Sequence, residues 1–120
     1  MPSRPESPAV EPTRDEVQRL AGPVVLEFGA EWCGHCTALA PRLAELLERF
    51  PTVRHIKVDD GPGRPLGRSF RVKLWPTLVF LRDGKILGQV SRPQQGPVLE
   101  GLRAITGDVG DEAPAQDVRL

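Results

Sequence analysis

The two cysteines of this 120-residue chain are the side chains whose type and spacing best suit chemistry. Cys33 and Cys36 enclose only Gly34 and His35, and no other cysteine occurs in the sequence. A disulfide framework that holds a small domain together needs more cysteines, spread along the chain. The isolated C-x-x-C pair therefore indicates redox chemistry or part of a metal site.

Two alternatives to redox chemistry remain open for this pair. Cys33, His35 and Cys36 are residues of the types that bind zinc, and His55 would be the fourth ligand. His35 is too close in sequence to both cysteines for comfortable tetrahedral geometry, and there is no second C-x-x-C. The thiols could also be inert packing residues, although redox motifs occur where a strand runs into a helix. We expect redox chemistry that needs no metal ion and no cofactor.

Cys33 is the better candidate nucleophile of the two cysteines. It follows a predicted strand-to-helix turn, and the unpaired amides and partial positive charge at a helix N-terminus favour a thiolate. Cys36 lies one turn further into the helix and is suited to resolving a mixed disulfide. His35, if protonated, adds a positive charge that lowers the pKa of Cys33 and makes the disulfide more oxidising.

The elements that must position this pair alternate between strands and helices. Thr13 is expected to cap a short first helix, with Glu16 in the capping-box position, and Asp83-Gly84 is a strong hairpin signal. Apolar patterns predict strands over 24–28, 53–58, 77–81 and 85–90, and helices over 33–50, 65–70 and 94–105. This order predicts an α/β fold with a mixed four-stranded sheet between helices, to which an extra N-terminal element can be added.

The composition of the two chain ends and the net charge limit the possible domain bounds and partners. Residues 1–12 hold four prolines and are predicted to be a disordered tail, residues 13–106 to be the domain, and residues 107–120 to be a loose tail. Sixteen basic and sixteen acidic residues give a net charge of zero, which does not favour nucleic-acid or membrane partners. Because no signal peptide or membrane-spanning run is visible, we expect a cytoplasmic monomer.

Three separated motifs resemble the thioredoxin superfamily. The stretch F-G-A-E-W-C-G-H-C at 28–36 resembles its active-site segment, W-P-T-L at 75–78 its cis-proline loop, and D-G-K at 83–85 its hairpin. The C-G-H-C core is more similar to protein disulfide isomerase than to ordinary thioredoxin, which has proline at the position of His35. On these matches, which span residues 14–106, the chain is identified as a bacterial thioredoxin-like protein with an isomerase-type active site.

The resemblance implies a thioredoxin fold and dithiol–disulfide exchange with protein substrates. Cys33 would be the nucleophile and Cys36 the resolving thiol, with an upstream reductase or a small-thiol donor restoring the pair. A cis peptide at Pro76 would leave the backbone of Trp75 free to pair with an extended substrate strand. The expected substrate-binding residues are Trp32, Gly34, Trp75, Pro76 and Ser91.

Glu27 is the most informative residue outside the motifs. A carboxylate within the apolar run 24–28 is unexpected, because burying it is costly unless it is paired or neutral. Its position matches the acid that the family uses to move the proton of the inner cysteine, so Glu27 is a candidate base or acid for Cys36. His55 aligns with the lysine that accompanies this acid and would tune Glu27. The alternatives are a Glu27 that points to solvent and a His55 that is a plain surface residue.

The sequence departs from the family pattern on the expected substrate face. Gly29 replaces an aromatic residue, which would leave a gap or a more mobile approach to the dithiol, and Ser91 replaces a glycine and is followed by Arg92. The function that we expect is a thioredoxin-like protein-disulfide reductase. The alternatives are a disulfide oxidase or isomerase, and a binding module with a regulatory dithiol.

Overall fold

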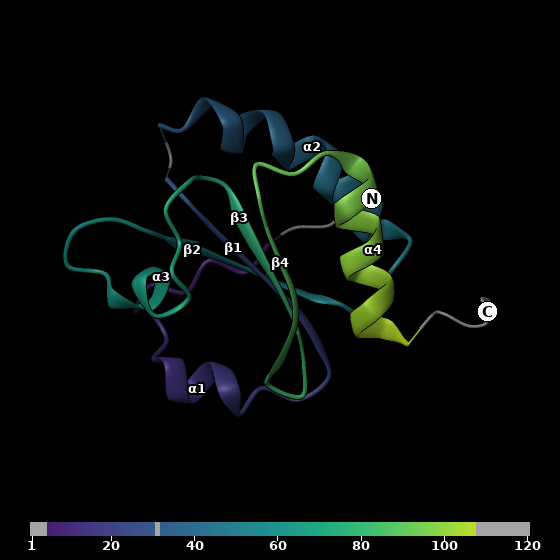
Figure 1. Cartoon of the computed structure of the whole chain (residues 1–120), viewed down its shortest axis with the longest axis horizontal. Coiled ribbons are helices and arrows are strands. Elements are labelled where there is room, and N and C mark those ends of the chain that lie inside the picture. The colour runs from purple at the N-terminus through teal and green to yellow at the C-terminus, as the bar shows by residue number, and fades with distance from the viewer. Residues whose placement is uncertain (1–4, 31, 108–120) are drawn as a thin grey trace.

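The computed structural model describes residues 5–30 and 32–107, which form a four-stranded sheet with helices on both faces (Figure 1). The strands are β1 (Pro23–Gly29), β2 (Arg54–Asp59), β3 (Thr77–Arg82) and β4 (Lys85–Ser91). The helices are α1 (Arg14–Gln18), α2 (Gly34–Glu48), α3 (Pro65–Ser69) and α4 (Gln95–Thr106). The predicted α/β class and element order are confirmed.

The strand order is β2-β1-β3-β4, with β1 parallel to β2 and antiparallel to β3. As a central strand, β1 is covered on both faces, which explains its nearly continuous apolar sequence. The β3–β4 hairpin turns at Asp83 and Gly84, whose φ angles of 50° and 80° suit the tight turn that this dipeptide predicts.

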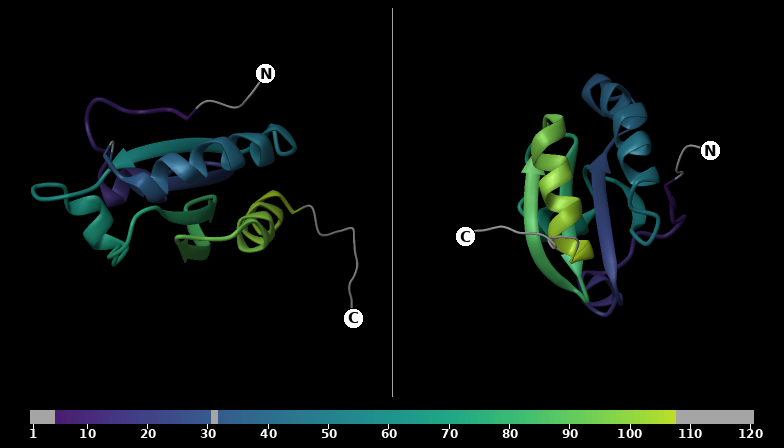
Figure 2. Two further views of the ribbon diagram at one scale, coloured as in Figure 1. Left: turned by 90° about the horizontal axis from the view of Figure 1, so that it is seen from above. Right: turned by 90° about the vertical axis from the view of Figure 1, so that its right-hand side faces the viewer.

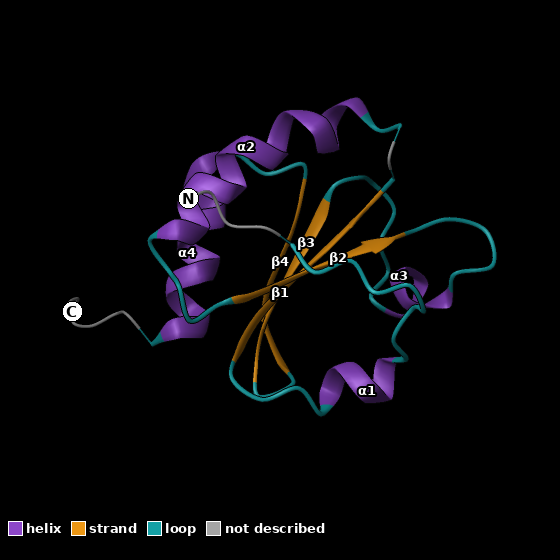
Figure 3. Cartoon of the chain, turned by 180° about the vertical axis from the view of Figure 1, so that it is seen from behind, coloured by secondary structure: helices purple, strands orange, loops and turns teal. Residues whose placement is uncertain are grey.

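Each face of the sheet has its own core. Helices α2 and α4 cover one face, and α1 and α3 cover the other (Figure 3). Val25 and Phe80 pack under α2 and α4, which lie beside each other (Figure 2), whereas Leu26 and Phe28 pack under α1 and α3. Within the described residues no helix is long and apolar enough to cross a membrane.

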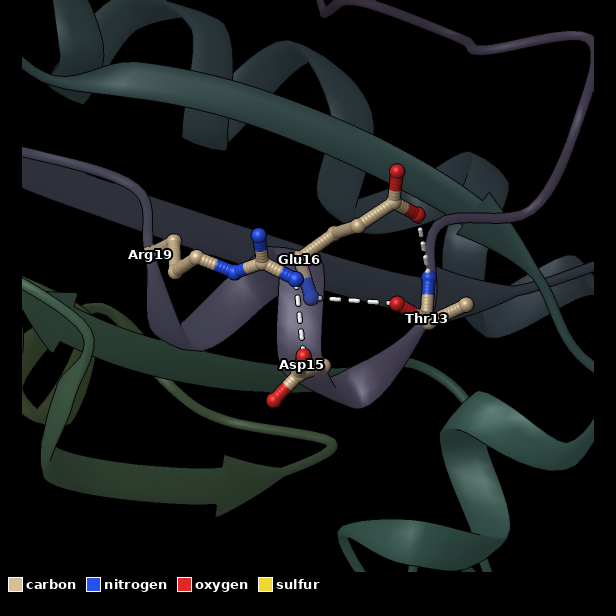
Figure 4. A network of polar contacts seen from close by, with 4 residues as sticks. All are labelled: Thr13, Asp15, Glu16 and Arg19. Carbon is tan, nitrogen blue, oxygen red and sulfur yellow. Dashed lines mark hydrogen bonds and ion pairs between the residues drawn. The ribbon is translucent and has the colours of Figure 1, made fainter.

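The start of α1 has the cap that its sequence predicts (Figure 4). The Thr13 hydroxyl accepts a hydrogen bond from the Glu16 amide at 3.0 Å, and the Thr13 amide donates to the Glu16 carboxylate at 2.8 Å. Asp15 and Arg19 add an exposed ion pair one turn along the helix. The reciprocal cap fixes the helix so that Val17 is buried in the core.

The N-terminal segment is more ordered than its composition predicts. Glu6 pairs with β2 as an isolated parallel bridge, in which its amide donates to the His55 carbonyl and its carbonyl accepts from the Lys57 amide. The Glu6 carboxylate also binds the Arg54 guanidinium in two hydrogen bonds of 2.7 and 2.9 Å. These contacts satisfy backbone groups at the edge of β2, and they join Glu6 to the domain that was expected to begin at residue 13.

The C-terminal end of the described region is a helix cap. Gly107 follows α4 with a left-handed φ of 69°, the conformation that glycine commonly supplies after a helix. Residues 108–120, the remainder of the predicted loose tail, lie outside the described residues, as do residues 1–4 of the predicted N-terminal tail.

Candidate active site

The dithiol lies at the N-terminus of α2, as its sequence context predicts. Cys33 is the N-cap residue, and its sulfur accepts a hydrogen bond from the Cys36 amide at 3.3 Å. Both cysteines are free thiols and both are buried, with exposed fractions of 7% and 3%. The amides of the first helical turn therefore point at the sulfur of Cys33, where they stabilise a negative charge.

Hydrogen bonds and one cation stabilise the Cys33 thiolate. Burial by itself would raise the pKa of Cys33, but hydrogen bonds from the thiol and amide of Cys36 and from the His35 amide outweigh it. The positive charge of Arg92 lowers the pKa of Cys33 further. His35 thus acts on the thiol through its backbone, while its imidazole side chain is exposed.

Cys36 has the opposite environment. Burial raises the pKa of its thiol to about 11, and the hydrogen bond with Cys33 and the negative charges of Cys33 and Glu27 act in the same direction. One thiol of the pair is therefore disposed to ionise and the other to keep its proton. This difference suits a nucleophile and a resolving thiol.

Glu27 and His55 form a buried pair beneath the dithiol. The exposed fraction of Glu27 is 2% and that of His55 is 7%, so neither is the solvent-facing residue of the alternative interpretation. His55 Nε2 lies 2.8 Å from Glu27 Oε1, and both residues are on the face of the sheet that α2 covers. Glu27 Oε2 and His55 Nδ1 are buried without a hydrogen-bond partner in the described part of the chain.

The Glu27 contact also bears on the zinc alternative, which needs His55 beside the two cysteines. His55 instead binds Glu27 through Nε2. Within residues 5–30 and 32–107, no group of three or more His, Cys, Asp or Glu side chains is placed to hold a metal ion.

The loop before β3 lies against the dithiol. The Trp75–Pro76 peptide bond is cis, and the Cys33 thiol lies 3.9 Å from the Trp75 carbonyl oxygen. That oxygen also accepts a hydrogen bond of 2.9 Å from Arg92 Nε, and the Arg92 amide donates to the Pro76 carbonyl. The Trp75 amide donates no hydrogen bond to any described residue, which leaves it available to a ligand.

Two tryptophan rings meet next to the dithiol, and Trp75 packs against the cluster of Ala30, Cys33 and Cys36. The Trp32 side chain is 79% exposed and meets the Trp75 ring edge to face, with centroids 5.2 Å apart. The Trp75 indole N–H donates to the Asp60 carboxylate at 2.8 Å, which fixes the orientation of this ring. The rings form a broad surface that is apolar and partly open to solvent.

The remaining two predicted site residues lie at the edges of this surface. Gly34 is the exposed first residue of α2. Ser91 ends β4, and its hydroxyl lies 2.8 Å from that of Thr77, which itself donates to the Leu74 carbonyl. Ser91 is therefore tied to the loop that carries Trp75 and Pro76.

The chain matches the thioredoxin family model over residues 9–102, which is most of its length. It belongs to the thioredoxin family. The structure is similar to thioredoxin 2 from Pseudomonas aeruginosa in its reduced form, with a TM-score of 0.77, 51% sequence identity, and coverage of 89% of this chain and 100% of that one.

Curated thioredoxins show the same relationship in sequence. The chain is 37% identical to an H-type thioredoxin of Ricinus communis, over 68% of this chain and 71% of the relative. It is 42% identical to thioredoxin Asp f 28 of Aspergillus fumigatus, over 56% of this chain and 62% of that protein. The chain thus spans only about three fifths of the Aspergillus protein's length.

Gly29 leaves no gap in this thioredoxin-family site, contrary to our expectation. A Cβ on Gly29 would lie 2.6 Å from the Cys36 sulfur, closer than any real contact. The sulfur of the inner cysteine fills the space in which a side chain would begin. A side chain at this position would require the Cys36 sulfur to shift.

Sequence reasoning missed Asp60 and the role of Arg92. Asp60 is anchored because its amide donates to the Gly29 carbonyl at 2.9 Å and its carboxylate packs against Gly67. Nothing local marks an aspartate in a turn as the partner of a distant tryptophan. Arg92 was visible only as a departure from the family pattern, since its hydrogen bond to Trp75 and the effect of its charge on the pKa of Cys33 require the folded chain.

Proposed function

We propose that this thioredoxin-family protein is a protein-disulfide reductase in which Cys33 is the nucleophile. Its thiolate attacks one sulfur of a substrate disulfide, so that the substrate S–S bond breaks and a mixed disulfide forms. Cys36 then attacks the Cys33 sulfur, which forms the Cys33–Cys36 disulfide and releases the reduced substrate. The observation that carries the proposal is the position of Cys33 at the N-cap of α2, where its sulfur accepts a hydrogen bond from the Cys36 amide and faces the Trp75–Pro76 loop.

Glu27 is the proposed base for the second step. A thiol with a pKa of about 11 is almost entirely protonated near neutrality, so Cys36 needs a group that takes its proton. The Glu27 carboxylate is buried, close enough for its charge to raise the pKa of Cys36, and has one oxygen with no other partner among the described residues. His55 holds the other oxygen and tunes the carboxylate.

The substrate is proposed to bind as an extended strand across the surface formed by Trp32, Gly34, Trp75, Pro76 and Ser91. The free Trp75 amide offers one backbone hydrogen bond to such a strand. The Trp75 carbonyl offers a second if the strand displaces the side chain of Arg92. Trp32 and Trp75 supply the apolar contact area around the reacting sulfur.

The net direction depends on the compartment and on the electron donor. In a reducing compartment such as the cytoplasm, an upstream reductase or a small thiol keeps the pair reduced, and the protein acts as a reductant. The lowered pKa of Cys33 stabilises the dithiol form and thereby favours the second candidate, a disulfide oxidase or isomerase. Equilibration with glutathione buffers distinguishes the two, since it gives the reduction potential.

Insulin reduction with dithiothreitol as donor tests the proposed activity. We expect the wild-type protein to accelerate precipitation of the insulin B chain and Cys33→Ser to return the rate to background. Activity that persists in Cys33→Ser would remove Cys33 as the nucleophile. An inactive wild type would instead support a binding module with a regulatory dithiol.

A further inference from the structure

A small basic pocket lies beside the dithiol, and the proposed exchange chemistry does not use it. Its volume is about 130 Å³, and we refer to it as the Arg42–Arg92 pocket. The loop between β4 and α4 runs close to α2 here (Figure 1), and the lining residues are His35, Ala38, Leu39, Arg42, Pro76, Arg92 and Pro93.

Among the described residues, the lining carries hydrogen-bond donors and positive charge but no carboxylate. Arg42, Arg92 and His35 are its polar side chains, and all three are exposed. Among the described residues no carboxylate lies within 4.0 Å of either guanidinium. Arg92 uses only Nε, on the Trp75 carbonyl, so its terminal N–H groups have no partner there. Two guanidinium groups facing one pocket favour an anion with planar oxygens.

The acidic residues of α2 that are nearest to Arg42 in sequence line a different pocket. Glu45 and Glu48 line a separate pocket further along the helix, together with Arg42 and Arg49. Arg42 therefore lines two pockets, and of these the one next to Pro76 has no acidic side chain from the described part of the chain. The positive character of the Arg42–Arg92 pocket is local, since the whole chain has a net charge of zero.

The pocket lies next to the reacting sulfur. Pro76 is part of its wall, and the carbonyl of the preceding Trp75 lies 3.9 Å from the Cys33 thiol. Arg92 belongs to both places, because it lines the pocket and donates to the Trp75 carbonyl. An extended substrate strand advances about 3.3 Å per residue. A substrate side chain held in the pocket would therefore lie within a few residues of the substrate cysteine whose sulfur Cys33 attacks.

We propose that the Arg42–Arg92 pocket is a subsite for a carboxylate that the disulfide substrate carries near its reacting cysteine. The inference rests on the proposed exchange function and names a substrate class for it. The volume suits a carboxylate and its methylene stem, since one water molecule takes about 30 Å³. Ala38, Leu39, Pro76 and Pro93 supply the apolar wall for the stem. The carboxylate comes from an acidic peptide side chain or from a small disulfide such as oxidised glutathione.

Matched peptide disulfides test this subsite. Three peptides that differ only in Glu, Gln or Lys two residues from the cysteine are compared by kcat/KM. We expect the Glu peptide to be reduced about fivefold faster than the Gln peptide, and the Lys peptide to be slowest, as for an exposed ion pair. The Glu preference should shrink in about 1 M salt, where the Debye length is about 3 Å.

Two arginine variants assign the effect to the pocket. Arg42→Gln should bring the ratio of Glu to Gln rates closer to one, since Arg92 is then the only guanidinium among the described lining residues. Arg49→Gln removes the same charge at the C-cap of α2, away from the pocket, and should leave the ratio of Glu to Gln rates unchanged. Equal rates for the Glu and Gln peptides in active wild type, or a preference that Arg42→Gln leaves undiminished, would overturn the subsite. No turnover of any peptide would instead refute the proposed function.

A second comparison identifies the source of the carboxylate. Reduction of oxidised glutathione is measured against that of hydroxyethyl disulfide, which carries no charge. If Arg42→Gln lowers the ratio of these two rates, the pocket accepts the small disulfide. If the variant lowers only the Glu-to-Gln peptide ratio, the pocket serves acidic peptide side chains.

Discussion

Cys33 and Cys36 show how far the environment can separate two identical side chains within one helical turn. Cys33 caps the helix and receives hydrogen bonds from the Cys36 thiol and from two backbone amides, so its pKa falls. Cys36 is enclosed beneath it, against Gly29, and its pKa rises to about 11. The order of thiol attack proposed above follows from this difference and not from the spacing of the motif alone.

The proposed role of Glu27 can be tested directly by substituting this residue. Glu27→Gln keeps the shape of the side chain but removes the base. We expect release of substrate from the Cys33 mixed disulfide to slow on the order of 10²-fold near neutral pH. The defect should diminish as the pH rises toward the pKa of Cys36, since solvent hydroxide then supplies the thiolate.

Stopped-flow release of a fluorescent substrate thiol from the preformed mixed disulfide gives these rates across the pH range. Glu27→Asp is the matched variant, because it retains a carboxylate and should recover part of the pH profile. If Glu27→Gln shows the same rates and pH profile as wild type, Glu27 has no part in the proton transfer.

At the scale of elements, the close packing of α4 against the sheet depends on the absence of a side chain at Gly101. A Cβ on Gly101 would collide with the ring of Phe80 on β3, and this ring is only 1% exposed and has little room to move. A Cβ on Gly96, in the first turn of the same helix, would have no heavy atom within 4 Å. Substitutions at these two glycines therefore distinguish the effect of tight packing from the effect of helix propensity.

Gly101→Ala should lower the free energy of unfolding by about 1–3 kcal/mol, because overpacking outweighs the better helix propensity of alanine. Gly96→Ala should leave it unchanged or raise it by up to about 1 kcal/mol. Urea denaturation of the two variants measures both values. Equal effects of the two substitutions would contradict the packing of α4 described here.

The elements themselves follow closely from local sequence. The cap formed by Thr13 and Glu16, the Asp83-Gly84 turn and the apolar periodicities predict all eight elements, and the seven for which the sequence gives bounds end within two residues of those observed. The contacts of Glu6 with the edge of β2 and with Arg54 escape such prediction because they join segments far apart in sequence. Composition reports only that the segment around Glu6 has little apolar surface.

At the scale of the whole molecule, the site is assembled from the ends of several elements. The C-terminal end of β1, the start of α2, the Trp75–Pro76 loop and the β4–α4 loop meet at Cys33. The cysteines and Pro76 could be singled out because motifs mark them, and Glu27 because it is a carboxylate within the apolar run 24–28. The Asp60–Trp75 bond and the Arg42–Arg92 pocket could not be, because each joins residues that only the fold brings together.

The central claim is that Cys33 attacks and Cys36 resolves, and single-cysteine variants test it most directly. The Cys36→Ser and Cys33→Ser proteins are each mixed with a peptide disulfide, and the covalent adduct is followed by intact-protein mass spectrometry near neutral pH. The pKa of Cys33 is lowered despite burial, by hydrogen bonds that include those from the Cys36 and His35 amides, whereas burial is the first cause that raises the pKa of Cys36 to about 11. We predict that the Cys33-only protein has the larger thiolate fraction near neutral pH and forms the adduct faster. Equal rates, or faster adduct formation by the Cys36-only protein, would contradict the account.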